Sequence, residues 1–175
     1  MTGHWQAGSG RALCWLPAAA ALVCMVLAGC GHAPASATTN GAGTAACAHA
    51  THFDRLTIDR LNPLHQNFHF VAPAQVTVTD ARQAQTVARA LCALPPVGHG
   101  VYNCPADWGI RYRLRFAARH HWFPPITIAA SGCRMVTGLR PVRLISGVFG
   151  LWAVLGKAAG LGHASVTTFT GTPRT

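Results

Sequence analysis

Carboxylate side chains are scarce in this chain. No glutamate occurs in its 175 residues, and the acidic residues are Asp54, Asp59, Asp80 and Asp107. Acid–base catalysis usually relies on two positioned carboxylates, so this scarcity weighs against enzymes of that kind. There is no G-x-S-x-G elbow, P-loop or H-E-x-x-H, and no G-x-G-x-x-G follows a predicted strand. The sequence therefore identifies no catalytic residue and no cofactor.

Lysine is almost missing as well, because Lys157 is the only one among 14 basic residues. The formal net charge of +10 therefore comes from arginine. The planar guanidinium group of arginine binds phosphate or carboxylate through two parallel hydrogen bonds. High-GC coding also favours arginine over lysine, so the charge alone does not identify an anionic partner.

A hydrophobic run long enough to cross a bilayer is also lacking. The N-terminal run from Ala12 to Ala28 contains Pro17 and falls short of the roughly 20 apolar residues that a spanning helix needs. Arg11 precedes this run, and Leu-Ala-Gly-Cys closes it at Cys30. This order is typical of a secretory signal.

The four residues that end at Cys30 resemble the lipobox of bacterial lipoproteins, in which the cysteine thiol carries a diacylglyceryl group. The sequence thus predicts a lipoprotein signal peptide over residues 1–29 and a mature chain that begins with a lipidated Cys30. Two acyl chains, of the palmitate type, hold a protein durably on a membrane. We therefore expect a lipid anchor at the extracytoplasmic face of the cell membrane. The alternative is an ordinary secreted protein in which Cys30 is an unmodified thiol.

Removal of the signal and lipidation of Cys30 determine which cysteines are available for disulfide bonds. Four cysteines then remain, namely Cys47, Cys92, Cys104 and Cys133. An even number in an oxidising compartment indicates two disulfides, for which three connectivities exist. We favour Cys104 with Cys133, because both flank a predicted hairpin at the same end. This pairing leaves Cys47 with Cys92, although the sequence alone keeps the connectivity open.

The mature chain divides into a tether, a domain and a tail. Residues 30–52 consist mostly of small residues and histidine and predict a flexible tether, of which about 20 residues span roughly 25 Å. Residues 53–163 are expected to form a single α+β domain. Residues 164–175 are rich in threonine and predict a frayed C-terminal tail.

Hydrophobic periodicity predicts the first part of the domain. Only short extended pieces can be assigned within residues 53–70. Residues 76–79 alternate as a half-buried strand does. Asp80 then stands at an N-cap position, with Gln83 three residues later, and the helix that follows ends before Pro95.

The second part of the domain predicts a hairpin and a helix. Residues 110–116 alternate strictly, and residues 126–130 are the expected returning strand of an antiparallel pair. Apolar residues at helical spacing predict a second helix over residues 146–161. The expected fold is a small antiparallel β-sheet with two helices packed on one face, stabilised by disulfides, in the α+β class.

Three arginines alternate along the predicted strand 110–116 and project from one of its faces: Arg111, Arg113 and Arg115. Guanidinium groups about 6.6 Å apart on one strand can follow a polyanion, and Arg119 extends the series. For a protein at the cell surface the expected anions are lipid headgroups or cell-wall polyanions, and no nucleic acid is expected. The plainer alternative is a solvated outer face of the sheet.

Ten histidines raise the question of a metal site. The pairs His49–His52 and His65–His69 have ligand-like separations, but no nearby carboxylate or cysteine cluster completes a site. The four mature cysteines are explained as disulfides. The sequence therefore predicts no metal ligand.

Three motifs follow one another in the predicted domain: Tyr-Asn-Cys-Pro-Ala-Asp-Trp-Gly at 102–109, Tyr-x-Leu-x-Phe at 112–116 and Ala-Ser-Gly-Cys at 130–133. They resemble motifs of a family of uncharacterised exported lipoproteins from high-GC Gram-positive bacteria. A helix that ends in Leu-Pro-Pro at 94–96 and a Phe-Gly-Leu-Trp segment at 149–152 also fit that family. The resemblance implies an exported lipoprotein with a paired cysteine, and it brings no activity with it.

Together these features predict a membrane-anchored cell-surface lipoprotein. We expect a noncatalytic binding or envelope-organising module, whose partners are the membrane lipid around the Cys30 acyl chains and an anionic ligand. The alternative is a surface hydrolase or metal-handling lipoprotein with a site that motifs do not reveal. The sequence makes no prediction of the oligomeric state.

Overall fold

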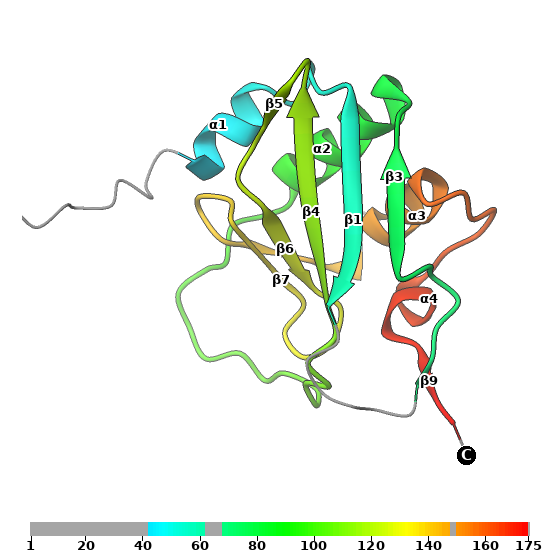
Figure 1. Cartoon of the computed structure of the whole chain (residues 1–175). Coiled ribbons are helices and arrows are strands. Elements are labelled where there is room, and N and C mark those ends of the chain that lie inside the picture. The colour runs from blue at the N-terminus through cyan, green and yellow to red at the C-terminus, as the bar shows by residue number, and fades with distance from the viewer. Residues whose placement is uncertain (1–41, 62–67, 148–149, 175) are drawn as a thin grey trace, which may run out of the picture. The chain divides into compact units, whose positions relative to one another are not determined.

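A seven-stranded antiparallel sheet forms the centre of the fold (Figure 1). The structure, a computed structural model, describes residues 42–61, 68–147 and 150–174. The predicted signal peptide, Cys30 and the first part of the predicted tether lie outside these residues. Among the helices that the structure describes, none has the length and apolar character needed to cross a bilayer.

The main path of the sheet runs in the order β3-β1-β4-β6-β7-β8, and β5 pairs with β4 beside this path. The bounds of these strands are β1 Arg55–Leu61, β3 Gln75–Val78, β4 Arg111–Ala118, β5 His121–Trp122, β6 Ile126–Ala129, β7 Met135–Thr137 and β8 Arg143–Leu144. A second, two-stranded sheet joins β2 Phe68–His69 to β9 Thr172–Pro173. Every pairing between these strands is antiparallel.

Within the residues that the structure describes, four α-helices accompany the sheet: α1 Ala42–Ala48, α2 Ala81–Ala93, α3 Leu151–Ala158 and α4 Val166–Thr170. The predicted cap of α2 is confirmed, because the Asp80 carboxylate accepts a hydrogen bond from the Gln83 N–H at 3.1 Å. Figure 1 shows α2 and α3 behind the sheet. The predicted α+β class, with helices packed on an antiparallel sheet, is therefore confirmed.

The core lies between the sheet and these helices. Strand β4 turns Tyr112, Leu114 and Phe116 toward it, and each of these side chains is almost fully buried. Helix α2 contributes the apolar stripe that its 3.6-residue period predicts: Ala84, Val87, Ala88 and Leu91. The alternation of β4 therefore leaves its arginines on the opposite face of the sheet.

Strand β1 is more regular than the sequence predicts. It pairs with β3 on one side and with β4 on the other, so it lies inside the sheet. Leu56 and Ile58 are buried at alternating positions, but polar residues and a nearby Pro63 obscure this pattern in the sequence. The strand is stabilised by its two neighbours more than by its own β-propensity.

The predicted boundaries of the tether and the tail need correction. The sequence predicts a tether up to residue 52, but residues 42–48 form α1, and Ala46 and Ala50 belong to the buried core. It also predicts a frayed tail after residue 163, whereas α4 buries Phe169 almost completely. Both segments therefore belong to the domain. The second predicted helix is shorter than expected, because α3 covers residues 151–158.

Both favoured disulfides are present in the structure. Cys47 of α1 is bonded to Cys92 of α2, with a Cα–Cα distance of 5.7 Å. Cys104 is bonded to Cys133 at the end of the hairpin, with a Cα–Cα distance of 4.8 Å. The first bond attaches α1 to the domain, and the second ties the long connection between α2 and β4 to the segment after β6.

Candidate functional site: the open face of the sheet

The face of the sheet that looks away from α2 and α3 carries the arginine row, and we call it the open face. Arg111, Arg113 and Arg115 alternate with the buried residues of β4, so all three side chains share this face. Arg113 and Arg115 are exposed, and Arg111 is half-buried. The structure thus places the three predicted arginines side by side on one strand.

Each arginine of the row has a different neighbour. Arg111 donates to the Asp107 carboxylate at 2.9 Å. Arg113 lies farther from its partner, with 3.7 Å between its Nε and Oδ2 of Asp59. Arg115 stacks over the Trp122 ring, with its guanidinium carbon 5.0 Å from the ring centroid. The neighbours orient the guanidinium groups without neutralising all of them.

The strand register adds further groups to the open face. Residues that face each other directly across an antiparallel pair share a face. Thr57 of β1 lies opposite Arg115, and Arg55 lies opposite Ala117, so both belong to the open face. Within the described residues, the guanidinium groups of Arg55 and the row outnumber the carboxylates of Asp59 and Asp107. The face is therefore locally basic.

Arg119 departs from the regular spacing of the row. Strand β4 ends at Ala118, and Arg119 lies in the following turn with a left-handed φ of 56°. Its backbone N–H donates to the Asp54 carboxylate. The predicted extension of the row through Arg119 is thus a turn rather than a continuation of the strand, although its side chain is exposed.

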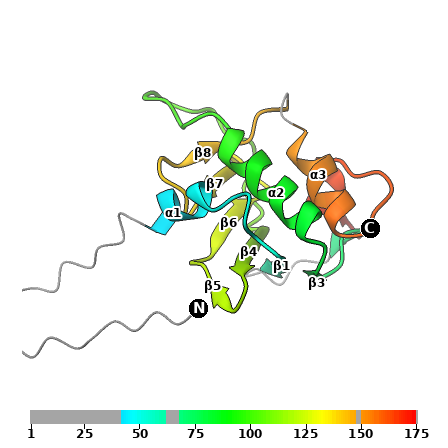
Figure 2. The same cartoon turned by 90° about the horizontal axis from the view of Figure 1, so that it is seen from above.

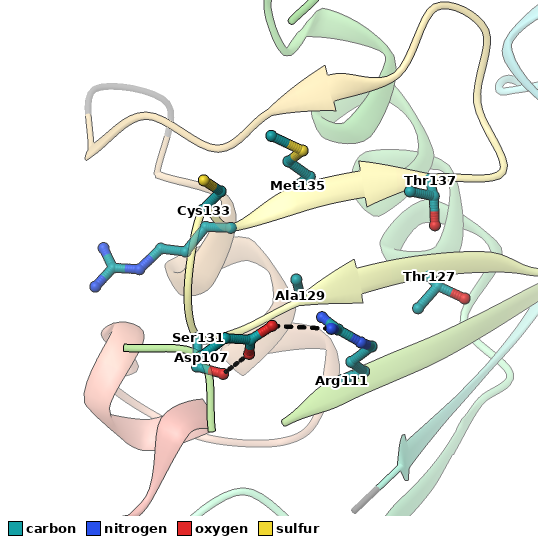
Figure 3. Close-up of a pocket in the computed structure, with 9 residues that line it drawn as sticks. Asp107, Arg111, Thr127, Ala129, Ser131, Cys133, Met135 and Thr137 are labelled. Carbon is teal, nitrogen blue, oxygen red and sulfur yellow. Dashed lines mark hydrogen bonds and ion pairs between the residues drawn. The ribbon is translucent and has the colours of Figure 1, made fainter. Parts of the chain in front are cut away.

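A shallow hollow of about 270 Å³ adjoins the Arg111 end of the row (Figure 3). Its lining includes Arg111, Thr127 and Thr137, which come from the neighbouring strands β4, β6 and β7. In Figure 3 Asp107 and Ser131 lie at one end of the hollow, beside Arg111. The hollow thus joins the row to hydroxyl groups on the adjacent strands.

Asp107 holds this end of the site in place. Its carboxylate accepts from Ser131 Oγ at 2.7 Å, from the Gly109 N–H at 2.9 Å and from Arg111 at 2.9 Å. These hydrogen bonds, that of Ser131 first, keep the pKa of Asp107 below its ordinary value. Asp107 is therefore ionised at neutral pH and acts as a fixed partner that orients Arg111.

Sequence reasoning missed the residues that surround the row. Asp59 is more than 50 residues from Arg113, and Asp59, Trp122 and Thr127 reach the open face through strand pairing. Only the alternation of β1 could have placed Asp59 on the same face as Thr57, and that strand was not identifiable. Asp107 and Ser131 are 24 residues apart, so no local pattern indicates their contact.

The histidines do not assemble into a metal site where the structure describes them. Over residues 42–61, 68–147 and 150–174, no three His, Cys, Asp or Glu side chains come together in a way that could hold a metal ion. The rings of His49 and His121 pack instead against Phe123, with centroid distances of 5.3 and 5.1 Å. His65, of the other predicted pair, lies outside the described residues.

No family model, no curated protein and no solved structure matches this chain. The resemblance to exported lipoproteins therefore stays a prediction.

Proposed function

We propose that the protein is a lipoprotein, held at the extracytoplasmic face of the cell membrane by acyl chains on Cys30, and that its open face binds cell-wall polyanions without catalysing a reaction. The observation that carries the binding proposal is the pair of exposed guanidinium groups of Arg113 and Arg115 on one face of β4. The evidence for the anchor is the N-terminal sequence that ends at Cys30.

The location is supported by two independent features. The order of charged, apolar and small residues before Cys30 is that of a lipoprotein signal. The two disulfides are typical of proteins that fold in an oxidising compartment. An acyl mass on Cys30 of the native protein would establish the anchor.

The polyanion is supported by the spacing and the charge of the open face. Alternate residues of a strand lie about 6.6 Å apart, so the row offers a linear series of donors to a repeating anionic chain. The Arg113 side chain is 47% exposed, and its distance of 3.7 Å from Asp59 leaves donors for a ligand. A surplus of arginine also attracts an anionic chain from a distance.

A noncatalytic role fits the lining of the hollow. Its one carboxylate, Asp107, already accepts three hydrogen bonds and keeps a lowered pKa. A general acid or base needs a pKa near the working pH. The alternative of a surface hydrolase gains no support from this residue.

Paired charge removal tests the open face. Arg113→Gln with Arg115→Gln removes two guanidinium groups from the row, and Arg82→Gln with Arg89→Gln removes two exposed ones from α2 as a control of equal charge. With long-chain inorganic polyphosphate as the probe, we expect the first variant to bind about tenfold more weakly, because each group makes charge-assisted hydrogen bonds that solvent partly screens.

The control variant should bind polyphosphate within about twofold of the wild type, since long-range attraction alone is reduced. Fluorescence anisotropy at two salt concentrations measures both constants, and denaturant unfolding confirms that both variants fold. Equal weakening of the two variants would show that net charge, and not the open face, attracts the anion. That result would overturn the proposed site.

A further inference from the structure

Two loops joined by a backbone hydrogen bond each carry exposed apolar side chains. We call Val101, Tyr102 and Val142 the loop patch; their exposed fractions are 103%, 37% and 38%. The Val97 N–H donates to the Val142 carbonyl at 2.9 Å, and the Tyr102 hydroxyl donates to the Gly98 carbonyl at 2.9 Å. The first bond links the loop after α2 to the loop before β8, and the second lies within the loop after α2 and holds Tyr102 against Gly98.

The loop patch is supported by the fold beneath it. The disulfide between Cys104 and Cys133 fixes the far end of the first loop. Arg143 donates from its guanidinium group to the Leu94 carbonyl at 2.8 Å, and the Leu144 N–H donates to the Pro95 carbonyl at 2.9 Å. The apolar side chains are thus presented by two loops that are tied to each other and to the sheet.

The segment with the loop before β8 is rich in arginine, and neither segment that carries the patch contains an acid. Residues 94–106 and 133–147 include Arg134, Arg140 and Arg143 but no Asp or Glu. Arg140 is exposed and lies two residues from Val142. Aromatic and apolar side chains flanked by arginine are the combination that partitions into the interface of an anionic bilayer.

The patch lies at the same end of α2 as the beginning of the described chain. The bond from Cys47 to Cys92 holds α1 against the last turn of α2, and the first patch loop leaves α2 directly after that turn. Figure 2 shows α1 and this loop at the end of α2 away from β3. Residues 31–41, which lie between Cys30 and α1, span at most about 40 Å when extended.

We propose that the loop patch inserts into the headgroup region of an anionic lipid bilayer and so docks the domain on the membrane. The presence of the patch near a bilayer rests on the proposed function, because the acyl chains on Cys30 would hold the patch within reach of that bilayer. The docking itself depends on the patch residues and is separable from the anchor. It leaves the arginine row of the open face for a second ligand.

Vesicle binding by the chain without its anchor tests the docking. Residues 30–175 with Cys30→Ser are mixed with vesicles of phosphatidylcholine that contain phosphatidylglycerol, and the bound fraction is measured by sedimentation. We expect binding to these vesicles and much weaker binding to phosphatidylcholine alone. Added Val101→Asp should lower the partition coefficient about tenfold or more, because a carboxylate resists insertion beside anionic lipid.

Val71→Asp is the matched control, since it makes the same charge change at another exposed valine, which is 62% accessible and lies between β2 and β3. It should leave the partition coefficient within about twofold. Absence of vesicle binding by the Cys30→Ser chain, or equal losses for Val101→Asp and Val71→Asp, would overturn the proposal. So would light scattering that shows a dimer abolished by Val101→Asp, because the patch would then bind a second copy.

The outcomes separate the docking from the proposed function. Arg113→Gln with Arg115→Gln should keep vesicle binding and lose polyphosphate binding, while Val101→Asp should do the reverse. Loss of vesicle binding through the arginine variant alone would assign lipid to the open face and would refute docking by the loop patch. An unmodified Cys30 in the native protein would refute the anchor without changing the vesicle result.

Discussion

Tyr112 shows how a single residue of β4 connects distant parts of the domain. Its ring is almost fully buried, and its hydroxyl donates to the Phe169 carbonyl of α4 at 2.8 Å. The two rings also meet edge to face, with centroids 5.3 Å apart. Burial raises the pKa of Tyr112 to about 12, against the smaller opposing effect of the Arg60 guanidinium group. The neutral hydroxyl therefore helps to hold α4 on the sheet.

Tyr112→Phe should lower the free energy of unfolding by about 1 kcal/mol, because the Phe169 carbonyl loses its buried donor. The folded pKa lies above the ordinary value of 10.0, so the folded state keeps a proton that the unfolded state loses. The stability of the wild type should therefore fall as the pH rises from about 10 toward 12, and this part of the fall should vanish in the variant.

Urea unfolding at a series of pH values measures both effects. Identical slopes for the wild type and Tyr112→Phe would contradict the argument that the buried hydroxyl is responsible.

Helix α3 illustrates how an element can depend on a position without a side chain. Gly156 is buried, and a Cβ atom added there would collide with Cβ of Ala164 in the segment that leads to α4. The Leu161 N–H also donates to the Gly156 carbonyl at 2.8 Å, which turns the chain back over the helix. The close approach explains a glycine inside a helix, where it otherwise reduces helicity.

Gly156→Ala should destabilise the domain by about 1–3 kcal/mol, because the clash with Ala164 outweighs the gain of about 1 kcal/mol in helix propensity. Gly147→Ala is the control, since no atom lies within 4 Å of the Cβ that it would add. Thermal unfolding followed by circular dichroism measures the difference. A Gly156→Ala variant as stable as the wild type would show that the segment after α3 moves away without cost.

At the scale of the whole molecule, the two proposed binding surfaces, the open face and the loop patch, lie at different positions on the domain. The open face lies on the side of the sheet opposite α2 and α3, and the loop patch lies where α2 ends. A domain that docks through the loop patch would keep its arginine row available for the cell wall. The anchor on Cys30 would keep both surfaces near the membrane, and the evidence for it comes from the sequence alone.

Mass spectrometry of the native protein checks the anchor. We expect a mature chain that begins at residue 30 and carries acyl mass on Cys30, because two acyl chains confer durable membrane attachment. Cys30→Ser should release the protein from the membrane fraction after cell lysis at high salt. A wild-type protein that is soluble, unmodified or cut elsewhere would contradict the anchor.

Much of the fold could be predicted from local patterns. The alternation of β4, the cap and apolar stripe of α2 and the hairpin that brings Cys104 toward Cys133 depend on neighbours within a few residues, so period and capping identify them. The same alternation places Arg111, Arg113 and Arg115 on one face. The amino-acid sequence itself determines these features, because the spacing of apolar residues within each element defines the side that is buried.

Only the tertiary structure decided which distant groups meet. The small residues of α1 predict no helix by their spacing, and α1 is held by its disulfide to α2 and by burial of Ala46. Strand register brought Asp59 to Arg113, and the hydrogen bond from the Val97 N–H to the Val142 carbonyl joined Val142 to the loop that carries Val101. Local periodicity does not predict such contacts, because they form only when separate elements pack around a common core.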